Sequence, residues 1–387
     1  MDWVSAGDGG IWSWGMSWLR AVTVAFAVFG VVRSASPAAA DPALVFEVES
    51  GRVIYAEDAD REWFPASLTK LMTTYLVFEA IEKGDLAPDM LLAVTPRANL
   101  QPPTRLGLGT GKTITVELAV RALVMKSAND IAVALAEATA GGVEEFVERM
   151  NDTARRLGMM HTRFANPHGL PSEHQMTTAR DMGLLGRALL RDFPDYAPVF
   201  AELELEVGRL KVASHNDLLR TLEGADGMKT GFTCAAGYNI VASATRGKRK
   251  IIAVVLGEAS GMDRSVRAAK LIEHGFQMFD WKSTFPGPLL DTLPYDIQPD
   301  VAPDFSRSAR MRKCDAPAGI ARAPQPRGNA AKVTAAAKDA KPAGSRMTPA
   351  VAGKEARPAG KVAKPATGKD GKSPAAKIQV ELAKARK

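Results

Sequence analysis

Ser67-Leu68-Thr69-Lys70 opens an apolar segment that continues to Lys83. The apolar residues of this segment recur at helical spacing and the pattern stops at Gly84, which predicts one helix over 67–83. Ser67 and Lys70 lie three positions apart, so their side chains share a face of that helix. A lysine whose pKa is lowered by burial or by a nearby cation is a base that can activate the serine hydroxyl. The alternative is a serine that caps the helix and a lysine in solvent.

Two further short motifs follow downstream. Ser127-Ala128-Asn129 interrupts two helical runs and supplies a second hydroxyl and an amide, with capping of the next helix as the alternative. Lys229-Thr230-Gly231 lies on a strand-like run, where Gly231 lets a substrate backbone approach; a plain edge strand with a solvated lysine is the alternative. Each motif alone is weak evidence for a catalytic site. All three in this order match the signature of penicillin-binding proteins and class A β-lactamases, so we expect them to converge on one cleft.

Strand-like runs lie near both ends of the predicted folded part. Ala43–Glu49 and Arg52–Glu57 form a hairpin joined by Ser50-Gly51. Three more strands are expected at 227–232, 238–244 and 250–257, with a helix over about 263–281. Residues 85–215 are predicted to be mainly helical, most clearly at 116–125, 130–139, 143–157 and 179–191. We therefore expect an α/β (α+β) fold in which an antiparallel sheet of about five strands is flanked by helices, with a mainly helical insertion.

Residues 1–40 carry the features of a signal peptide. A basic residue precedes the apolar run Ala21–Val32, and Ala38 and Ala40 form a cleavage pattern, so the mature chain is predicted to begin at Asp41. An uncleaved membrane anchor is the alternative, although the run is shorter than the roughly 20 residues that span a bilayer. We expect an exported protein, in the periplasm or at the outer face of the cytoplasmic membrane.

The C-terminal part differs in composition from the predicted catalytic domain, residues 41–282. Residues 283–305 are rich in proline and aspartate and are predicted to be a linker, and 306–387 are a basic Ala/Lys/Pro-rich tail predicted to be disordered. From Arg307 onward 20 Lys+Arg stand against 5 Asp+Glu, a net charge of +15, so the remainder carries −8 of the total of +7. Such a tail suits anionic lipid or wall polymers; a solvated tail without function is the alternative.

Longer blocks around the motifs resemble the serine D-alanyl-D-alanine carboxypeptidases, the low-molecular-mass penicillin-binding proteins of peptidase family S11. These blocks are Pro65–Thr73, Lys126–Asp130, Asn166–Leu170, Thr178–Asp181, and Gly227–Thr233 with Ala236–Asn239. The resemblance covers residues from about 43 to 281. It implies a serine β-lactamase/penicillin-binding-protein-like fold, removal of the terminal D-alanine from peptidoglycan stem peptides through an acyl-enzyme, and inhibition by penicillins and other β-lactams.

The resemblance also implies the catalytic roles. Ser67 is the nucleophile, Lys70 is its general base, and Ser127 helps to pass the proton to the leaving amine. The backbone N–H groups of Ser67 and Phe232 form the oxyanion hole. His168, in the Asn166–Leu170 block, is expected to be structural.

Further residues are implied to bind the substrate. Asn129 hydrogen-bonds the substrate peptide. The terminal carboxylate is held by Lys229 and Thr230, beside Gly231, and by a further arginine, Arg264.

Two other functions stay open. A β-lactamase would share the fold and the three motifs and would differ by a glutamate placed for deacylation; Glu173 lies in the right region, but the residues after it do not give E-x-x-x-N. The non-enzyme alternative is a protein that binds peptidoglycan or another polyanion through its tail. Nucleic acid is not expected as a partner, because an exported chain does not meet the chromosome.

The cysteines and histidines give no sign of a metal site. Cys234 and Cys314 permit either one disulfide bond or two unpaired thiols. Neither belongs to a C-x-x-C pair, and the five histidines show no metal-ligand spacing. We therefore expect no metal and no cofactor.

Overall fold

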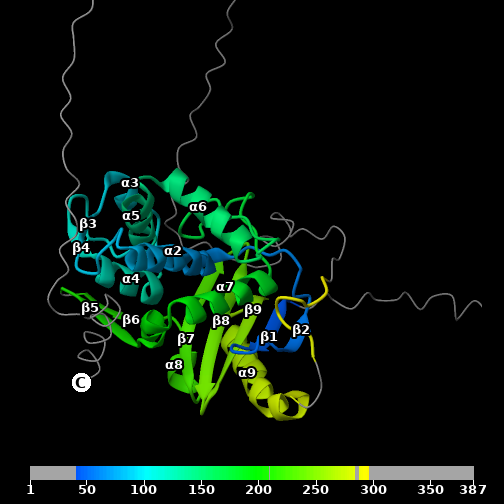
Figure 1. Cartoon of the computed structure of the whole chain (residues 1–387). Helices are drawn as coiled ribbons and strands as arrows, with labels where there is room; N and C mark the ends of the chain where they lie inside the picture. Colours follow the sequence, from blue (N-terminus) through cyan, green and yellow to red (C-terminus); the bar gives the residue numbers. More distant parts are fainter. Residues whose placement is uncertain (1–40, 209, 284–286, 296–387) are drawn as a thin grey trace, which may run out of the picture.

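The computed structural model describes residues 41–208, 210–283 and 287–295. Figure 1 shows one antiparallel sheet with the strand order β2-β1-β9-β8-β7. Its strands are β1 (Ala43–Glu47), β2 (Val53–Glu57), β7 (Ala225–Thr233), β8 (Gly237–Arg246) and β9 (Arg249–Glu258). These are the five strands predicted from the hairpin and the three late runs, so the predicted sheet is confirmed.

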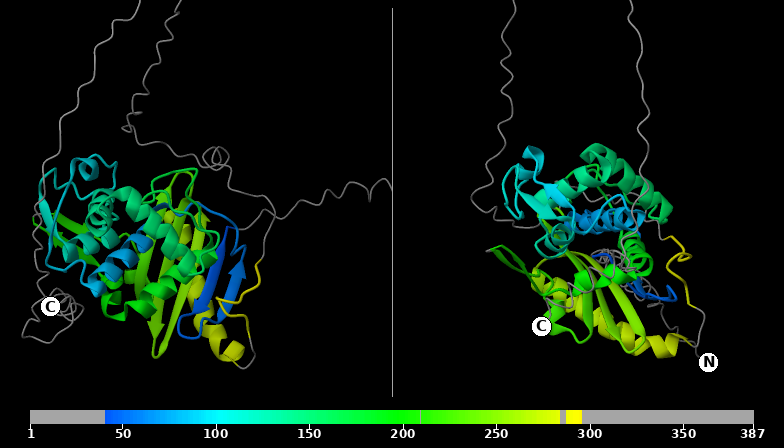
Figure 2. Two further views of the ribbon diagram at one scale, coloured as in Figure 1. Left: turned by 45° about the horizontal axis from the view of Figure 1, so that its top comes forward. Right: turned by 60° about the vertical axis from the view of Figure 1, so that its left-hand side comes forward.

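Both faces of the sheet are covered, which explains the nearly continuous apolar run in β9. Ile251, Ala253 and Val255 pack with the helix α9 (Gly261–Ser283). Their alternate neighbours Ile252 and Val254 belong to the larger core on the opposite, helical side. Because successive side chains of a strand point to opposite faces, β9 contributes to both halves of the core. Figure 2 shows α9 (yellow) on one face of the sheet and the other long helices on the opposite face.

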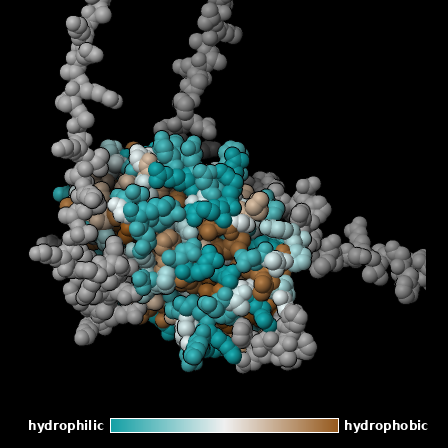
Figure 3. Space-filling model, in the orientation of Figure 1, coloured by the Kyte–Doolittle hydropathy of each residue, from teal (hydrophilic) through white to brown (hydrophobic). Residues whose placement is uncertain are grey.

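The helical part is built around α2, which is buried on almost every side. Its partners are α4, α5, α6 and α7, and its side chains from Lys70 to Phe78 are all buried. The helices are α2 (Lys70–Lys83), α3 (Pro96–Asn99), α4 (Val116–Met125), α5 (Asn129–Ala140), α6 (Val143–Arg156), α7 (Ala179–Asp192) and α8 (Leu218–Thr221). The charged side of α6 faces outward, where Figure 3 shows a hydrophilic surface.

Three features of the helical region differ from the prediction. The helix expected from residue 67 begins instead with a 3-10 turn, η1 (Ala66–Thr69), and a second one, η2, covers Pro194–Ala201. Two small sheets interrupt the helices. They pair β3 (Leu91–Ala93) with β4 (Thr113–Thr115), and β5 (Glu204–Val207) with β6 (Leu210–Ala213). Strands of three or four residues are too short to show a two-residue period in the sequence.

After α9 the chain returns to the sheet and packs on it. The Leu290 side chain is buried, and its N–H donates to the Gly51 carbonyl at 2.8 Å. Arg180, only 2% exposed, pairs with Asp60 at 2.7 Å and donates to the Pro294 carbonyl at 2.9 Å. Part of the range predicted to be a linker is therefore held against the folded body.

Several predictions concern segments that lie outside the described residues. They are the signal peptide at 1–40, the export that follows from it, the basic tail at 306–387, and the pairing of Cys234 with Cys314. These predictions and the exact domain bounds stay predictions. Within the ranges that the structure describes, no helix has the length and apolar character needed to cross a membrane.

Candidate active site

Ser67 lies in a tight turn between the sheet and α2. The residue before it, Ala66, has φ +48°, a left-handed conformation that costs a non-glycine residue roughly 1–2 kcal/mol. Strand β7 passes so close that a Cβ on Gly231 would lie 3.1 Å from the Ser67 backbone nitrogen. The strained turn is thus packed directly against β7, which fixes the place of the Ser67 hydroxyl.

Lys70 is fully buried beside Ser67. Its Nζ donates to Ser67 Oγ at 3.0 Å, to Asn129 Oδ1 at 2.8 Å and to the backbone carbonyl of His168. Burial, and then the positive charge of Lys229, hold the Lys70 pKa well below its usual value, against the opposing effect of Asp130. A lysine in solvent is excluded, because the Lys70 side chain is 0% exposed. The arrangement is that of a hydroxyl with an adjacent base.

Ser127 and Asn129 come from the connection between α4 and α5. The Asn129 side chain accepts from Lys70 and donates to the Pro102 carbonyl at 3.0 Å. Ser127 has φ +59°, and its buried hydroxyl has no hydrogen-bond partner among the described residues, which is rare for a buried polar group. The capping alternative is wrong: α5 begins at Asn129 after Ala128, and no side chain caps it.

Lys229 is buried at the edge of the sheet, so the alternative of a solvated lysine on β7 is also wrong. Its side chain is 2% exposed, and its Nζ donates to the Thr230 carbonyl at 3.0 Å. Burial and the charge of Arg264 lower the Lys229 pKa to about 7. Arg264, on α9, is itself 6% exposed, and its Nε is buried without a hydrogen-bond partner in the described part of the chain.

His215 belongs to the same group of basic residues, and sequence reasoning missed it. Its pKa is lowered by burial and by the positive charges of Lys229, Lys126 and Arg264, in that order. The residue lies just after β6, and no local pattern marks it; only the folded chain brings it near β7. Positive groups gathered at one place, with an unpaired arginine nitrogen among them, favour a bound carboxylate.

His168 contributes its backbone rather than its imidazole to the site. Its carbonyl accepts from Lys70, while its Nδ1 accepts from the N–H of Leu170 at 3.2 Å. Burial and the charges of Lys70 and Arg97 lower the His168 pKa to about 3, so the ring is neutral at ordinary pH. This agrees with the structural role expected for His168.

The remaining predicted residues lie along β7. Thr230 is 7% exposed, whereas Phe232 is 44% exposed and its ring lies 4.2 Å from that of Tyr238. Their predicted roles, a carboxylate contact for Thr230 and an oxyanion contact for the Phe232 N–H, stay predictions. Among the described residues, no group of three or more His, Cys, Asp or Glu side chains could hold a metal ion.

Asn239 on β8 ends one of the family-like blocks, but sequence reasoning gave it no role. It is completely buried, its Nδ2 donates to the carbonyls of Phe64 (2.9 Å) and Pro65 (3.2 Å), and its Oδ1 accepts from the Gly257 N–H at 2.9 Å. It thereby ties the chain just before Ser67 to two strands. A signal existed in the sequence, because a polar residue stands directly before the apolar run that begins at Ile240.

Replacing Asn239 with aspartate is expected to slow acylation of Ser67 about 100-fold, the effect of a shift of about 1 Å in a reacting group. The carboxylate would face two carbonyls that now receive a donor. The measurement is the rate of covalent labelling by a penicillin, together with the free energy of unfolding. Ser243→Ala, on the same strand as Asn239, is the control, because it removes a partly buried hydrogen bond from that strand to Asp226 on β7. Equal labelling rates in the two variants would contradict a positioning role.

The sequence model of the D-alanyl-D-alanine carboxypeptidase family, Peptidase S11, matches residues 31–260. The chain belongs to this family. It is 35% identical over 243 residues to D-alanyl-D-alanine carboxypeptidase DacA of Haemophilus influenzae, covering 61% of this chain and 62% of that one. It is 36% identical over 244 residues to DacC of Escherichia coli, covering 61% of each chain. This chain thus spans about three fifths of the length of these relatives.

Solved structures of penicillin-binding proteins share the fold. Penicillin-binding protein 5 of Haemophilus influenzae superposes with a TM-score of 0.60 at 35% identity, covering 62% of this chain and 71% of that chain. Penicillin-binding protein D2 of Listeria monocytogenes, in its ampicillin-bound form, gives 0.57 at 34% identity, covering 62% of this chain and 97% of that chain. The predicted penicillin-binding-protein-like fold is confirmed.

Proposed function

We propose that the chain is a serine-type D-alanyl-D-alanine carboxypeptidase that removes the terminal D-alanine from peptidoglycan stem peptides. The observation that carries this proposal is the contact between Lys70 Nζ and Ser67 Oγ at 3.0 Å, with the lysine buried and its pKa lowered. A hydroxyl within hydrogen-bond reach of such a base can act as a nucleophile. The activity named for the family relatives supports the same reaction.

In the acylation step, the free amine of Lys70 takes the proton of Ser67 as Oγ attacks the carbonyl carbon of the penultimate D-alanine. The backbone N–H groups of Ser67 and Phe232 stabilise the developing oxyanion. The peptide C–N bond then breaks, and a proton that Ser127 helps to relay reaches the leaving nitrogen. D-alanine departs, and its acyl partner stays as an ester on Ser67. Water then hydrolyses the ester and returns the proton to Ser67.

Substrate binding is assigned to the polar groups around the serine. The terminal carboxylate would lie against Lys229, Thr230 and Arg264, where the buried Arg264 Nε has no partner among the described residues. Asn129 would bind the peptide, and Gly231 keeps β7 close to the Ser67 turn. A bound carboxylate would compensate the positive charges of Lys229 and Arg264, whose burial otherwise costs free energy.

Mass spectrometry of the purified protein with a penicillin tests the proposal. A penicillin offers a reactive amide and a carboxylate, so we expect one covalent adduct on the unmutated protein and none on Ser67→Ala. Ampicillin bound to the Listeria relative supports this expectation. An adduct that persists on Ser67→Ala, or its absence from both proteins, would overturn the assignment of Ser67.

The same experiment separates a carboxypeptidase from a β-lactamase, because a β-lactamase would clear the adduct within seconds. We expect slow clearance. Glu173, the one glutamate in the region where a deacylating base is expected, is exposed to solvent, whereas the base proposed for Ser67, Lys70, is buried.

A further inference from the structure

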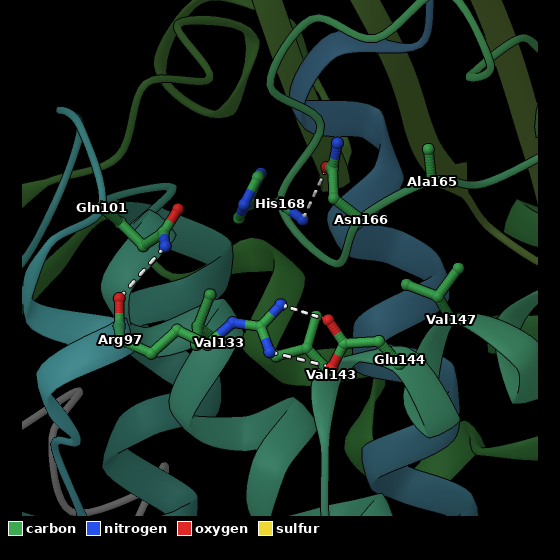
Figure 4. A pocket seen from close by; sticks show the side chains of 9 residues that line it. All are labelled: Arg97, Gln101, Val133, Val143, Glu144, Val147, Ala165, Asn166 and His168. Atoms are coloured by element: carbon green, nitrogen blue, oxygen red, sulfur yellow. Dashed lines mark hydrogen bonds and ion pairs between the residues drawn. The ribbon is translucent and has the colours of Figure 1, made fainter. Parts of the chain in front are cut away.

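A cavity of about 270 Å³ lies next to the site, separated from Lys70 by His168, and no role has been given to it so far. Figure 4 shows its walls, which come from α3, α5, α6 and the 165–168 loop. We propose that this cavity binds a small amino-acid zwitterion with the size and charge of the alanine released by the proposed reaction. The choice of alanine as the ligand rests on the proposed function. The inference that the ligand is a zwitterion rests on the residues that line the cavity.

The cavity carries one positive and one negative group side by side. Arg97 donates to both carboxylate oxygens of Glu144, at 2.8 and 2.7 Å. Their side chains are 49% and 70% exposed, and a surface pair of this kind contributes little to stability, so it opens at small cost. A zwitterion that enters between them replaces one ion pair with two, because its carboxylate meets Arg97 and its ammonium meets Glu144.

His168 adds a neutral donor to the same wall. Its Nδ1 accepts from the Leu170 N–H, so the proton of the neutral ring is on Nε2. Since the burial of His168 and its positive neighbours keep it uncharged, the charged groups of the lining are one arginine and one glutamate. A lining that holds one positive and one negative group, and therefore has no net charge, favours a zwitterion over a simple anion or cation.

The apolar part of the lining sets the size of the ligand. Val133, Val143 and Val147 form that part of the wall, from α5 and α6. The volume lies below the roughly 300–1,000 Å³ of pockets for drug-sized ligands. An amino acid as small as alanine therefore has room in the cavity between the charged pair and the valines.

The test is calorimetric titration of D-alanine into protein already acylated by a penicillin, so that the Ser67 site is filled. We expect one binding site with a Kd of roughly 1 mM. Propionate and isopropylamine, which each lack one of the two charges, should bind about 10-fold more weakly or worse. Arg97→Gln and Glu144→Gln should each weaken D-alanine binding by at least about 10-fold. Val147→Phe should fill the cavity and remove the binding.

Arg149→Gln on α6 is the matched control, because it removes the same charge from a residue that does not line the cavity. It should bind D-alanine as the unmutated protein does. The proposal is overturned if D-alanine does not bind the acylated protein, if Arg97→Gln leaves the affinity unchanged, or if propionate binds as tightly as D-alanine. A protein that no penicillin acylates would contradict the proposed function alone; the Arg97 and Val147 comparisons on the unmodified protein would still decide the cavity.

Discussion

Lys70→Arg is expected to slow acylation of Ser67 by a factor of about 10²–10⁴, the usual contribution of a general base. Arginine is another long basic side chain, but it is not deprotonated in proteins, so it cannot take the proton from Ser67. The buried partners of Lys70, Asn129 Oδ1 and the His168 carbonyl, can still accept from a guanidinium. Stopped-flow measurement of penicillin acylation gives the rate directly.

The pH dependence gives an independent check. Lys70 is a base only when it is neutral, and its pKa lies well below the usual 10.5, so acylation should fall as the pH drops through that lowered pKa. Lys229 must be charged to hold a carboxylate, and its pKa is about 7 in the free protein. Binding should therefore weaken as the pH rises above about 7, and the profile should be bell-shaped. In Lys70→Arg the acid limb should disappear.

Lys250→Arg is the control for the chemical change itself. Lys250 lies on β9, is partly exposed, and forms an ion pair with Asp226 of β7 at 3.0 Å. The same substitution there therefore leaves the site intact. It should acylate at the unmutated rate. If Lys70→Arg retained that rate as well, Lys70 would not be the base, and another group would have to deprotonate Ser67.

The sequence predicts the fold where periodicity is long enough to read. The alternation in β9, with Ile251 on one face and Ile252 on the other, and the apolar residues at helical spacing in α2 both correspond to buried elements. The small sheets β3–β4 and β5–β6 could not be predicted, because their strands are only three or four residues long. Their pairing depends on tertiary contacts rather than on local pattern.

The candidate active site, too, could be predicted only in part from local sequence patterns. The three motifs name Ser67, Lys70, Ser127, Asn129 and Lys229, but nothing local says that Lys70 is buried or that its amine bonds to a residue 59 positions away. Ala66 in a left-handed conformation, and the unpaired hydroxyl of Ser127, depend on how several segments meet. His215 and Asn239 contact segments far from them in the sequence, so only the folded chain shows what they do.

Gly169→Ala is expected to slow acylation at least about 100-fold, although the changed residue is not a catalytic group. Gly169 has φ +86°, and a Cβ there would lie 1.9 Å from the Ala66 carbonyl oxygen and 3.0 Å from the Ser67 nitrogen. Because those neighbours are backbone atoms, either the 165–170 loop or the Ser67 turn must move. A displacement of about 1 Å in a reacting group is enough for such a loss. Penicillin acylation rates and thermal unfolding would be measured together.

Gly158→Ala separates this effect from backbone strain. Gly158 has φ +77°, and a Cβ there would meet nothing within 4 Å. Both variants should therefore lose roughly 1–2 kcal/mol of stability from the left-handed conformation, but only Gly169→Ala should acylate slowly. The loop is also held by the Thr73 hydroxyl, which donates to the Pro167 carbonyl at 2.6 Å, so the simplest way to relieve the clash is a shift of the strained Ala66–Ser67 turn. If the two variants acylated at the same rate, Ser67 would owe its position to β7 and Asn239 rather than to the loop behind it.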